Sequence, residues 1–177
     1  MSLPLVVDFS EQKVLVAGCG ATAVRCLFAL VQAGAQVRLI ATGELPKEIE
    51  LMVANGEIRH WDRRARRSDL SQVRWVFIAE KDLRFRKQLL AWARGQKIWA
   101  TSLVSEREGS AFLPPGMEVS GVTLAFWGRG TGPNWPVYLR RRLQRALPRW
   151  LRQAKGAGPR LKRRLIRGWH SVARFTD

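Results

Sequence analysis

The sequence is poor in residues that bind metals or form disulfides. Its 177 residues include only two cysteines, Cys19 and Cys26, and two histidines, His60 and His170. Two cysteines with no second pair and no histidine cluster exclude a disulfide framework and the usual kinds of zinc site. We therefore expect both cysteines to be reduced packing residues, and each histidine to be a separate surface or partly buried side chain. No metal site is predicted.

Long apolar runs are also missing. The sequence has no stretch of about 18 apolar residues, the length that a membrane-spanning helix needs. Met1–Val7 is too short to hold the apolar core of a signal peptide. Together these features predict a cytoplasmic protein.

Acidic residues are scarce, and the charge is unevenly distributed. The chain has 31 Lys and Arg against 14 Asp and Glu, a net charge of +17 at pH 7. Residues 139–177 hold 13 of the basic residues and one acid, Asp177. Over Arg160–Phe175 the apolar residues recur at helical spacing, opposite a face of Arg and Lys. The excess charge therefore belongs to a C-terminal tail that suits an acidic partner.

A glycine turn follows the first apolar segment. Val14–Ala17 is predicted to be a strand, and a helix is predicted to end near Ala33. Between them lies Gly18-Cys19-Gly20-Ala21-Thr22-Ala23, a G-x-G-x-x-A sequence. In nucleotide-binding βαβ units the first glycine permits a tight turn, the second lets a pyrophosphate approach the backbone, and the helix N-terminus favours the anion. With the strand Gln36–Ala41 that follows, this pattern indicates such a unit.

Strand and helix patterns alternate through the first 105 residues. Helices are predicted over Glu44–Asn55 and Asp82–Arg94, and strands over Glu57–Trp61, Arg74–Ala79 and Lys97–Thr101. This alternation predicts an α/β fold with a Rossmann-like, doubly wound, mostly parallel sheet. The basic segment Arg63–Ser68 is interpreted as a solvated connector.

The pattern changes after residue 105. Two strands joined by Pro114-Pro115-Gly116 are expected, followed by a helix from about Asn134 to Leu147. We therefore predict three parts: a nucleotide-binding domain at 1–109, a small strand and helix region at 110–148, and a basic helical tail at 149–177.

Several short motifs, taken in order, resemble one known family. They are Leu3-Pro4-Leu5, Gly18-x-Gly20, Ala33-Gly34-Ala35, Ile78-Ala79-x-x-Asp82, Ser110-Ala111-Phe112-x-Pro114, Gly130-x-x-Pro133, and Leu139-Arg140 through Leu147-Pro148. Over residues 3 to about 170 the chain resembles the precorrin-2 dehydrogenase/sirohydrochlorin ferrochelatase family, equivalent to the N-terminal module of siroheme synthase. The resemblance implies an NAD cofactor and a homodimer formed through residues 110–148. It also implies hydride transfer from precorrin-2 to NAD, giving sirohydrochlorin. Because precorrin-2 is a polycarboxylate tetrapyrrole, the basic tail suits it.

The resemblance also assigns site residues by position. It implies cofactor contacts at Gly18, Cys19, Gly20, Ala21, Thr22 and Thr101, and substrate contacts at Ser110, Arg129 and Arg140. Arg25 is either near the cofactor or simply a surface charge of the helix. No acidic residue ends the second strand at Ala41-Thr42, so no carboxylate contact to the cofactor ribose is predicted. Glu44 follows, and a carboxylate at the start of a helix is its simpler interpretation.

The chain departs from the family at the position of its acid/base aspartate. That position is Val104 here, and valine cannot transfer a proton. Glu106 and Glu108 lie close enough in sequence to be candidate substitutes. The family's serine-rich turn is replaced by Trp127-Gly128-Arg129-Gly130-Thr131-Gly132-Pro133, and Glu80 would repel cofactor phosphates. Iron insertion is therefore not expected.

Three functions remain open from the sequence. The first is NAD-dependent dehydrogenation of precorrin-2, a reaction that can depend mainly on positioning of the reactants. The second is a non-catalytic role in binding a tetrapyrrole or a nucleotide. The third is binding of nucleic acid or an anionic membrane surface through the basic tail. No recognised nucleic-acid motif is present, so the third is not favoured. The sequence does not decide between NAD and NADP.

Overall fold

The computed structural model describes residues 4–105, 108–119, 122–126 and 138–145. The chain forms two compact units, Met1–Leu113 and Pro114–Asp177. The predicted helix at Arg160–Phe175, the basic tail and the turn at 127–133 lie outside the described residues. The three-part division with boundaries after residues 109 and 148 stays a prediction.

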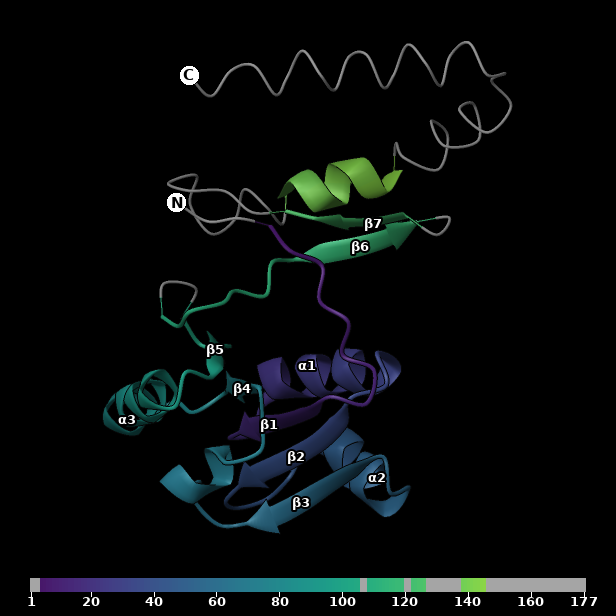
Figure 1. The fold of residues 1–177 in the computed structure, drawn as a ribbon. Coiled ribbons are helices and arrows are strands. Elements are labelled where there is room, and N and C mark those ends of the chain that lie inside the picture. The colour runs from purple at the N-terminus through teal and green to yellow at the C-terminus, as the bar shows by residue number, and fades with distance from the viewer. Residues whose placement is uncertain (1–3, 106–107, 120–121, 127–137, 146–177) are drawn as a thin grey trace, which may run out of the picture. The chain divides into compact units, whose positions relative to one another are not determined.

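The first unit is built on a five-stranded parallel sheet with strand order β3-β2-β1-β4-β5 (Figure 1). The strands are β1 (Lys13–Ala17), β2 (Gln36–Ala41), β3 (Ile58–Asp62), β4 (Trp75–Ile78) and β5 (Trp99–Ser102). From β1 the chain adds β2 and then β3 on one side, and it then crosses over to add β4 and β5 on the other side. The strand order therefore reverses at β1. The predicted Rossmann-like α/β fold is confirmed. In such sheets ligands bind at the carboxyl ends of the strands beside this reversal.

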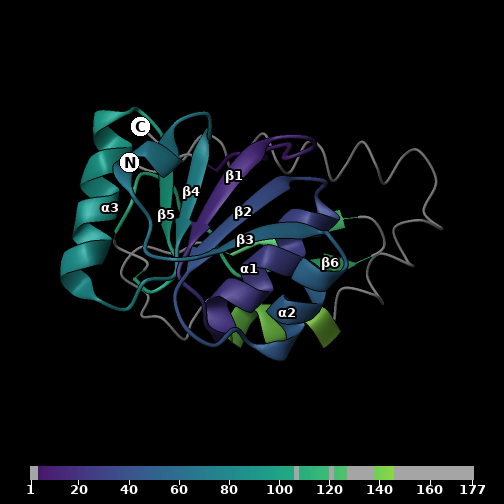
Figure 2. The ribbon, with the colours of Figure 1, turned by 90° about the horizontal axis from the view of Figure 1, so that it is seen from below.

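Both faces of the sheet are covered. α1 (Ala21–Gln32) and α2 (Lys47–Ala54) lie on one face, and α3 (Leu83–Gly95) lies on the other (Figure 2). Successive β1 side chains alternate between them: Val14 and Val16 belong to the α1 side, Leu15 and Ala17 to the α3 side. All four are buried, as expected for a parallel strand covered on both faces.

Two predicted segments of the first unit differ from the structure. α2 begins at Lys47 rather than Glu44, because Pro46 occupies the position before the helix and disfavours helical backbone in the residue that precedes it. The connector after β3 is not simply solvated. It contains the 3₁₀ helix η1 (Arg67–Leu70), and Leu70 is buried under the sheet. A bidentate contact from Arg63 to Asp69, at 2.7 and 2.6 Å, holds this connector and lowers the pKa of Asp69.

The outer edge of β5 is partly covered by the segment that follows it. Gly109 forms a bridge with Thr101, and the N–H groups of Ser110 and Ala111 donate to Ala100 O at 2.9 and 3.1 Å. Gly109 has a φ of +116°, and a Cβ there would lie 2.4 Å from Ala100 O. Only glycine allows the chain to pass this close to the strand.

The second unit contains an antiparallel pair, β6 (Gly116–Val119) and β7 (Val122–Ala125), and a helical segment over 138–145. The expected proline-glycine connection between two strands is wrong, because Pro114 and Pro115 precede β6. Proline has no N–H for a strand ladder, but its carbonyl can accept, and Pro115 O accepts from Phe126 N–H at 2.9 Å.

Candidate functional site

The turn after β1 is tight and depends on Gly18. Its φ is +92°, and a Cβ there would lie 3.0 Å from Ala79 C and Glu80 N. Its N–H donates to Ile40 O at 2.9 Å, which ties the turn to β2. The backbone therefore turns at the point where β1, β2 and β4 end together.

The start of α1 is open. Gly20 precedes the helix with a φ of +148°, and a Cβ placed on it would meet nothing within 4 Å among the described residues. No side chain of the described segments caps this end, and no acidic residue stands in the first turn. The first backbone N–H groups of a helix have no partner inside it and attract an anion. The predicted contacts at Gly18, Cys19, Gly20, Ala21 and Thr22 thus share one turn, next to the exposed Arg25.

The turn after β4 faces the same edge of the sheet. Glu80, expected to repel phosphates, accepts the Asp82 N–H at 3.2 Å through Oε1, so its carboxylate is drawn toward the start of α3. Asp82 caps that helix by accepting from the N–H groups of Arg84 and Phe85 at 2.9 and 3.3 Å. These contacts fix the turn without occupying the space before α1.

The position to which the resemblance assigns the family aspartate lies just after β5. Leu103 N–H donates to Ile78 O at 2.8 Å, and Ser105 N–H donates to Ser102 Oγ at 3.1 Å. Val104 lies between them and is 46% exposed. An aspartate at this position would therefore reach solvent at the carboxyl edge of the sheet, whereas the valine presents no titratable group there.

Glu108, one of the candidate substitutes, is already engaged. Its Oε2 accepts from Arg86 Nε at 2.6 Å, and the Arg86 side chain is only 8% exposed. Arg86 Nη1 also donates to the carbonyls of Glu80 and Lys81, at 3.1 Å each. One buried guanidinium thus joins the turn after β4 to the segment after β5. Glu106, the other candidate, lies outside the described residues.

The network around Arg86 could not be inferred from the sequence. Arg86 lies three residues before the buried Leu89 and seven before the buried Ala93, so it stands on the face of α3 that packs against the sheet. A charged residue at a core position is the available signal. Its partner Glu108 is 22 residues away and is found only from the fold.

Two other predicted residues hold the sheet together. Thr101 is 1% exposed, and its hydroxyl accepts from the Trp75 indole N–H at 2.9 Å. The Ser110 hydroxyl accepts from Ala100 N–H at 2.9 Å. Their roles in contacting cofactor or substrate stay predictions. Arg129 lies outside the described residues, and Arg140 lies in the helical segment of the second unit, where its buried Nε has no partner among the described residues.

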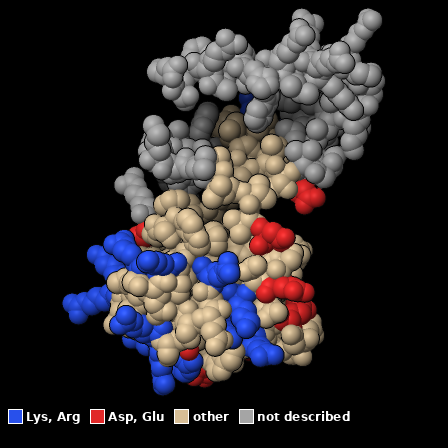
Figure 3. Space-filling model, in the orientation of Figure 1, with Lys and Arg blue, Asp and Glu red and all other residues tan. Residues whose placement is uncertain are grey.

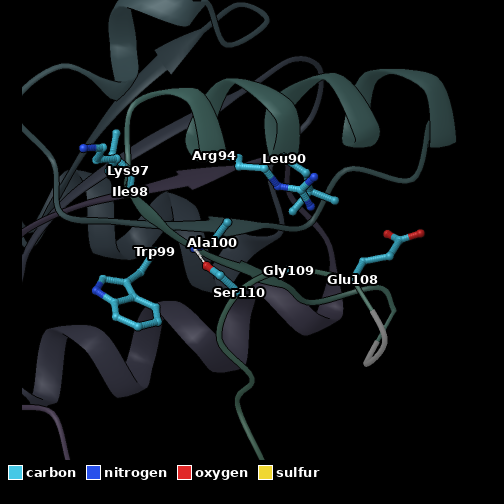
Figure 4. A pocket seen from close by; sticks show the side chains of 9 residues that line it. All are labelled: Leu90, Arg94, Lys97, Ile98, Trp99, Ala100, Glu108, Gly109 and Ser110. Carbon is cyan, nitrogen blue, oxygen red and sulfur yellow. Dashed lines mark hydrogen bonds between the residues drawn. The ribbon is translucent and has the colours of Figure 1, made fainter. Parts of the chain in front are cut away.

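A pocket of about 490 Å³ lies along β5 and α3 (Figure 4). Leu90 and Arg94 project from α3 on one side, Glu108, Gly109 and Ser110 line the other, and Trp99 points away from the helix. Basic side chains gather on the side of the first unit where α3 lies (Figure 3). The pocket brings together the predicted residues Glu108 and Ser110, but none of the glycine turn lines it.

The described residues contain no group of three or more His, Cys, Asp or Glu side chains that could hold a metal ion. In the same part of the chain, none of the helices has the length and apolar character needed to cross a bilayer. Cys26 lies on the buried face of α1, in the core, and burial raises its pKa to about 12.

Comparison with known proteins identifies the family. Residues 5–115 match the model of the family described as "Putative NAD(P)-binding". The chain belongs to this NAD(P)-binding family. Siroheme synthase of Zymomonas mobilis is 30% identical over 168 residues, which cover 92% of this chain and 35% of that protein. Siroheme synthase of Actinobacillus pleuropneumoniae is 26% identical over 173 residues, again 92% of this chain and 35% of that protein.

A solved structure supports the same assignment of fold. SirC, described as a precorrin-2 dehydrogenase, matches 82% of this chain and 71% of its own with a TM-score of 0.68 and 21% identity. The resemblance inferred from the motifs is confirmed by the match to the NAD(P)-binding family model and by the siroheme synthase relatives. The chain spans about a third of the length of the curated relatives it matches.

Proposed function

We propose that this chain is an NAD-dependent dehydrogenase of siroheme biosynthesis that converts precorrin-2 to sirohydrochlorin. The observation that carries the proposal is the open glycine turn at the strand-order reversal. There, among the residues that the structure describes, no side chain caps the helix N-terminus and no atom lies within 4 Å of a Cβ placed on Gly20. The siroheme synthase relatives are named for this pathway, and SirC, which shares the fold, is named for this reaction.

The site residues divide the work between binding and positioning. The amides after Gly20 would hold the cofactor pyrophosphate, and the Arg86 network would fix the wall made by the turns after β4 and β5. A bound NAD would supply the hydride acceptor, and the substrate would release one proton as its conjugation extends. Val104 supplies no group to take that proton, so we expect it to pass to solvent and the reaction to be driven mainly by positioning.

The direct test is turnover by the purified protein. Precorrin-2 and NAD are mixed with the protein under anaerobic conditions, and NADH and sirohydrochlorin are followed by their absorbance. Formation of both in equal amounts is expected. Tight binding of precorrin-2 without NADH formation would instead select the non-catalytic role, which the exposed Val104 and the engaged Glu108 favour.

Val104→Asp tests the assigned position of the missing acid. A carboxylate there would restore a proton acceptor at the carboxyl edge, so the rate should rise by about tenfold or more, below the roughly 100-fold that a well-placed general base typically contributes. Val104→Asn is the control, because it has the same shape but cannot accept the proton as a base. Equal rates for the two variants would contradict this placement.

The remaining parts of the proposal are a homodimer and the role of the tail. Both come from the family resemblance, which implies pairing through residues 110–148 and a basic tail that binds the carboxylates of the tetrapyrrole. Light scattering of the purified chain tests the first, and a dimer mass is expected.

A further inference from the structure

β2 itself ends without an acidic residue, but the parallel register places an acidic side chain from β3 beside its end. Asp62 is the last residue of β3 and lies opposite Ala41, the last residue of β2. Its Oδ1 accepts from the Gly43 N–H at 3.3 Å. His60 on the same strand donates from Nε2 to Ala41 O at 3.1 Å, which fixes the two strand ends together. The carboxylate is therefore anchored to the turn after β2 although it comes from β3.

This turn is also joined to the glycine turn. Gly18 N–H donates to Ile40 O at 2.9 Å, and Cys19 Sγ lies 4.0 Å from Glu44 O. A dinucleotide whose pyrophosphate lies at the start of α1 places its adenosine ribose at the end of the second strand. In this chain Asp62 is the acidic side chain tied to that strand end.

The two arginines that follow Asp62 in the chain make contacts elsewhere. Arg63 holds Asp69 through both carboxylate oxygens, and Arg64 pairs with Asp82 at 3.8 Å while lying over the Phe85 ring at 5.1 Å. Asp62 itself is exposed and has no ion-pair partner within 4.0 Å in the part of the chain that the structure describes. A 2′-phosphate here would meet an unpaired carboxylate, whereas a 2′-hydroxyl could donate to it.

We propose that Asp62 accepts the 2′-hydroxyl of the adenosine ribose and makes this site select NAD over NADP. The inference rests on the proposed function, because it assumes that a nicotinamide dinucleotide occupies the glycine turn. The proposal adds a specificity-determining residue to that function. This residue comes from β3, whereas the strand that ends beside the ribose is β2.

The test measures affinity for NAD, NADP and 2′-deoxy-NAD by calorimetry on the full chain. The wild-type protein should bind NAD at least about tenfold more tightly than either of the others, the size expected for one hydrogen bond to a charged group. In Asp62→Asn the preference over NADP should fall by about tenfold or more. The difference in affinity between NAD and 2′-deoxy-NAD should also become smaller in the same variant. Glu48→Gln, an exposed carboxylate on α2, is the matched control and should leave all three ratios within about twofold.

Each other result has a distinct meaning. A ratio unchanged in Asp62→Asn, or changed instead in Glu44→Gln, would overturn the role of Asp62. Equal binding of NAD and NADP by the wild-type protein would overturn the inference and leave the proposed dehydrogenase intact. Failure of both nucleotides to bind the folded protein would overturn the proposed function as well. Melting curves without nucleotide show that each variant is folded, and ratios of affinities do not depend on the active fraction.

Discussion

Cys19 and Cys26 belong to the same glycine turn and helix but lie in opposite surroundings. Cys19 is half-buried between the two glycines of the turn. Cys26 is 2% exposed in the core, and its pKa is raised to about 12 by burial. Since the thiolate is the reactive form, Cys26 should be inert in the folded protein.

This contrast predicts a footprint of the cofactor. With iodoacetamide, Cys19 should be alkylated in the native protein, and saturating NAD should slow that reaction at least about fivefold, because a bound pyrophosphate limits access to the turn. Mass spectrometry of the two peptides gives both rates, with Cys26 as the internal control. Unprotected alkylation of Cys19 under conditions where NAD is bound would place the cofactor elsewhere.

Glu108 is best understood through the buried partner that it satisfies. Glu108→Ala would leave the Arg86 guanidinium without its carboxylate, which should lower the free energy of unfolding by about 2–3 kcal/mol. Glu108→Gln keeps an acceptor oxygen and should cost about half as much. Urea denaturation measures both, with the exposed Glu57→Ala as the surface control. If Glu108→Ala costs no more than the control, Glu108 is free to act as an acid or base after all.

At the scale of elements, the turn between β1 and α1 depends on two separate properties of glycine. Gly18 has a positive φ, and it also lies against the backbone of Ala79 and Glu80. Gly56 has a φ of +74° but nothing within 4 Å of a Cβ among the described residues. The two glycines therefore separate backbone strain from steric contact.

Gly18→Ala should consequently be more harmful than Gly56→Ala. Both substitutions should lower the free energy of unfolding by about 1 kcal/mol because of the left-handed backbone, and only Gly18→Ala must also push β4 and β1 apart. We expect a Tm several degrees lower for Gly18→Ala than for Gly56→Ala, together with loss of NAD binding in the former alone. Equal Tm values would show that the turn can widen without cost.

The sequence predicts elements well where the signal is local. β2 is found at Gln36–Ala41 as expected, because β-branched and apolar residues lie between a glycine and a threonine turn. α2 and β6 are misplaced where prolines shift a boundary. Asp62 and Arg86 are missed because their partners, Gly43 and Glu108, come from other elements, and only strand register and helix packing bring them together.

At the scale of the whole molecule, the dominant feature is the uneven charge. Residues 139–177 contain 13 of the 31 basic residues, while the acids lie almost entirely before them. Because Coulomb attraction to a polycarboxylate is screened by salt, a role for this tail in holding precorrin-2 has a clear signature.

Replacing Arg160, Lys162, Arg163 and Arg164 with glutamine should weaken precorrin-2 binding by about tenfold at low salt and much less at high salt. The affinity for NAD should stay within about twofold, since the glycine turn is untouched. Fluorescence quenching by the tetrapyrrole at two ionic strengths measures the effect. An equal loss at both ionic strengths would exclude an electrostatic role for these residues.

Gly109 has a further consequence for the behaviour of the protein at high concentration. Gly109 allows the segment that follows β5 to lie against that strand and to occupy the N–H and C=O of Ala100. Without this segment, these two groups would be free to pair with a strand of another molecule. A valine at this position could not fit beneath Ala100 O, and the segment would have to lift away. The absence of a side chain at Gly109 thus keeps the β5 edge from pairing with a strand of another molecule. Gly109→Val should therefore cause aggregation, measured as turbidity, under conditions where the core is still folded.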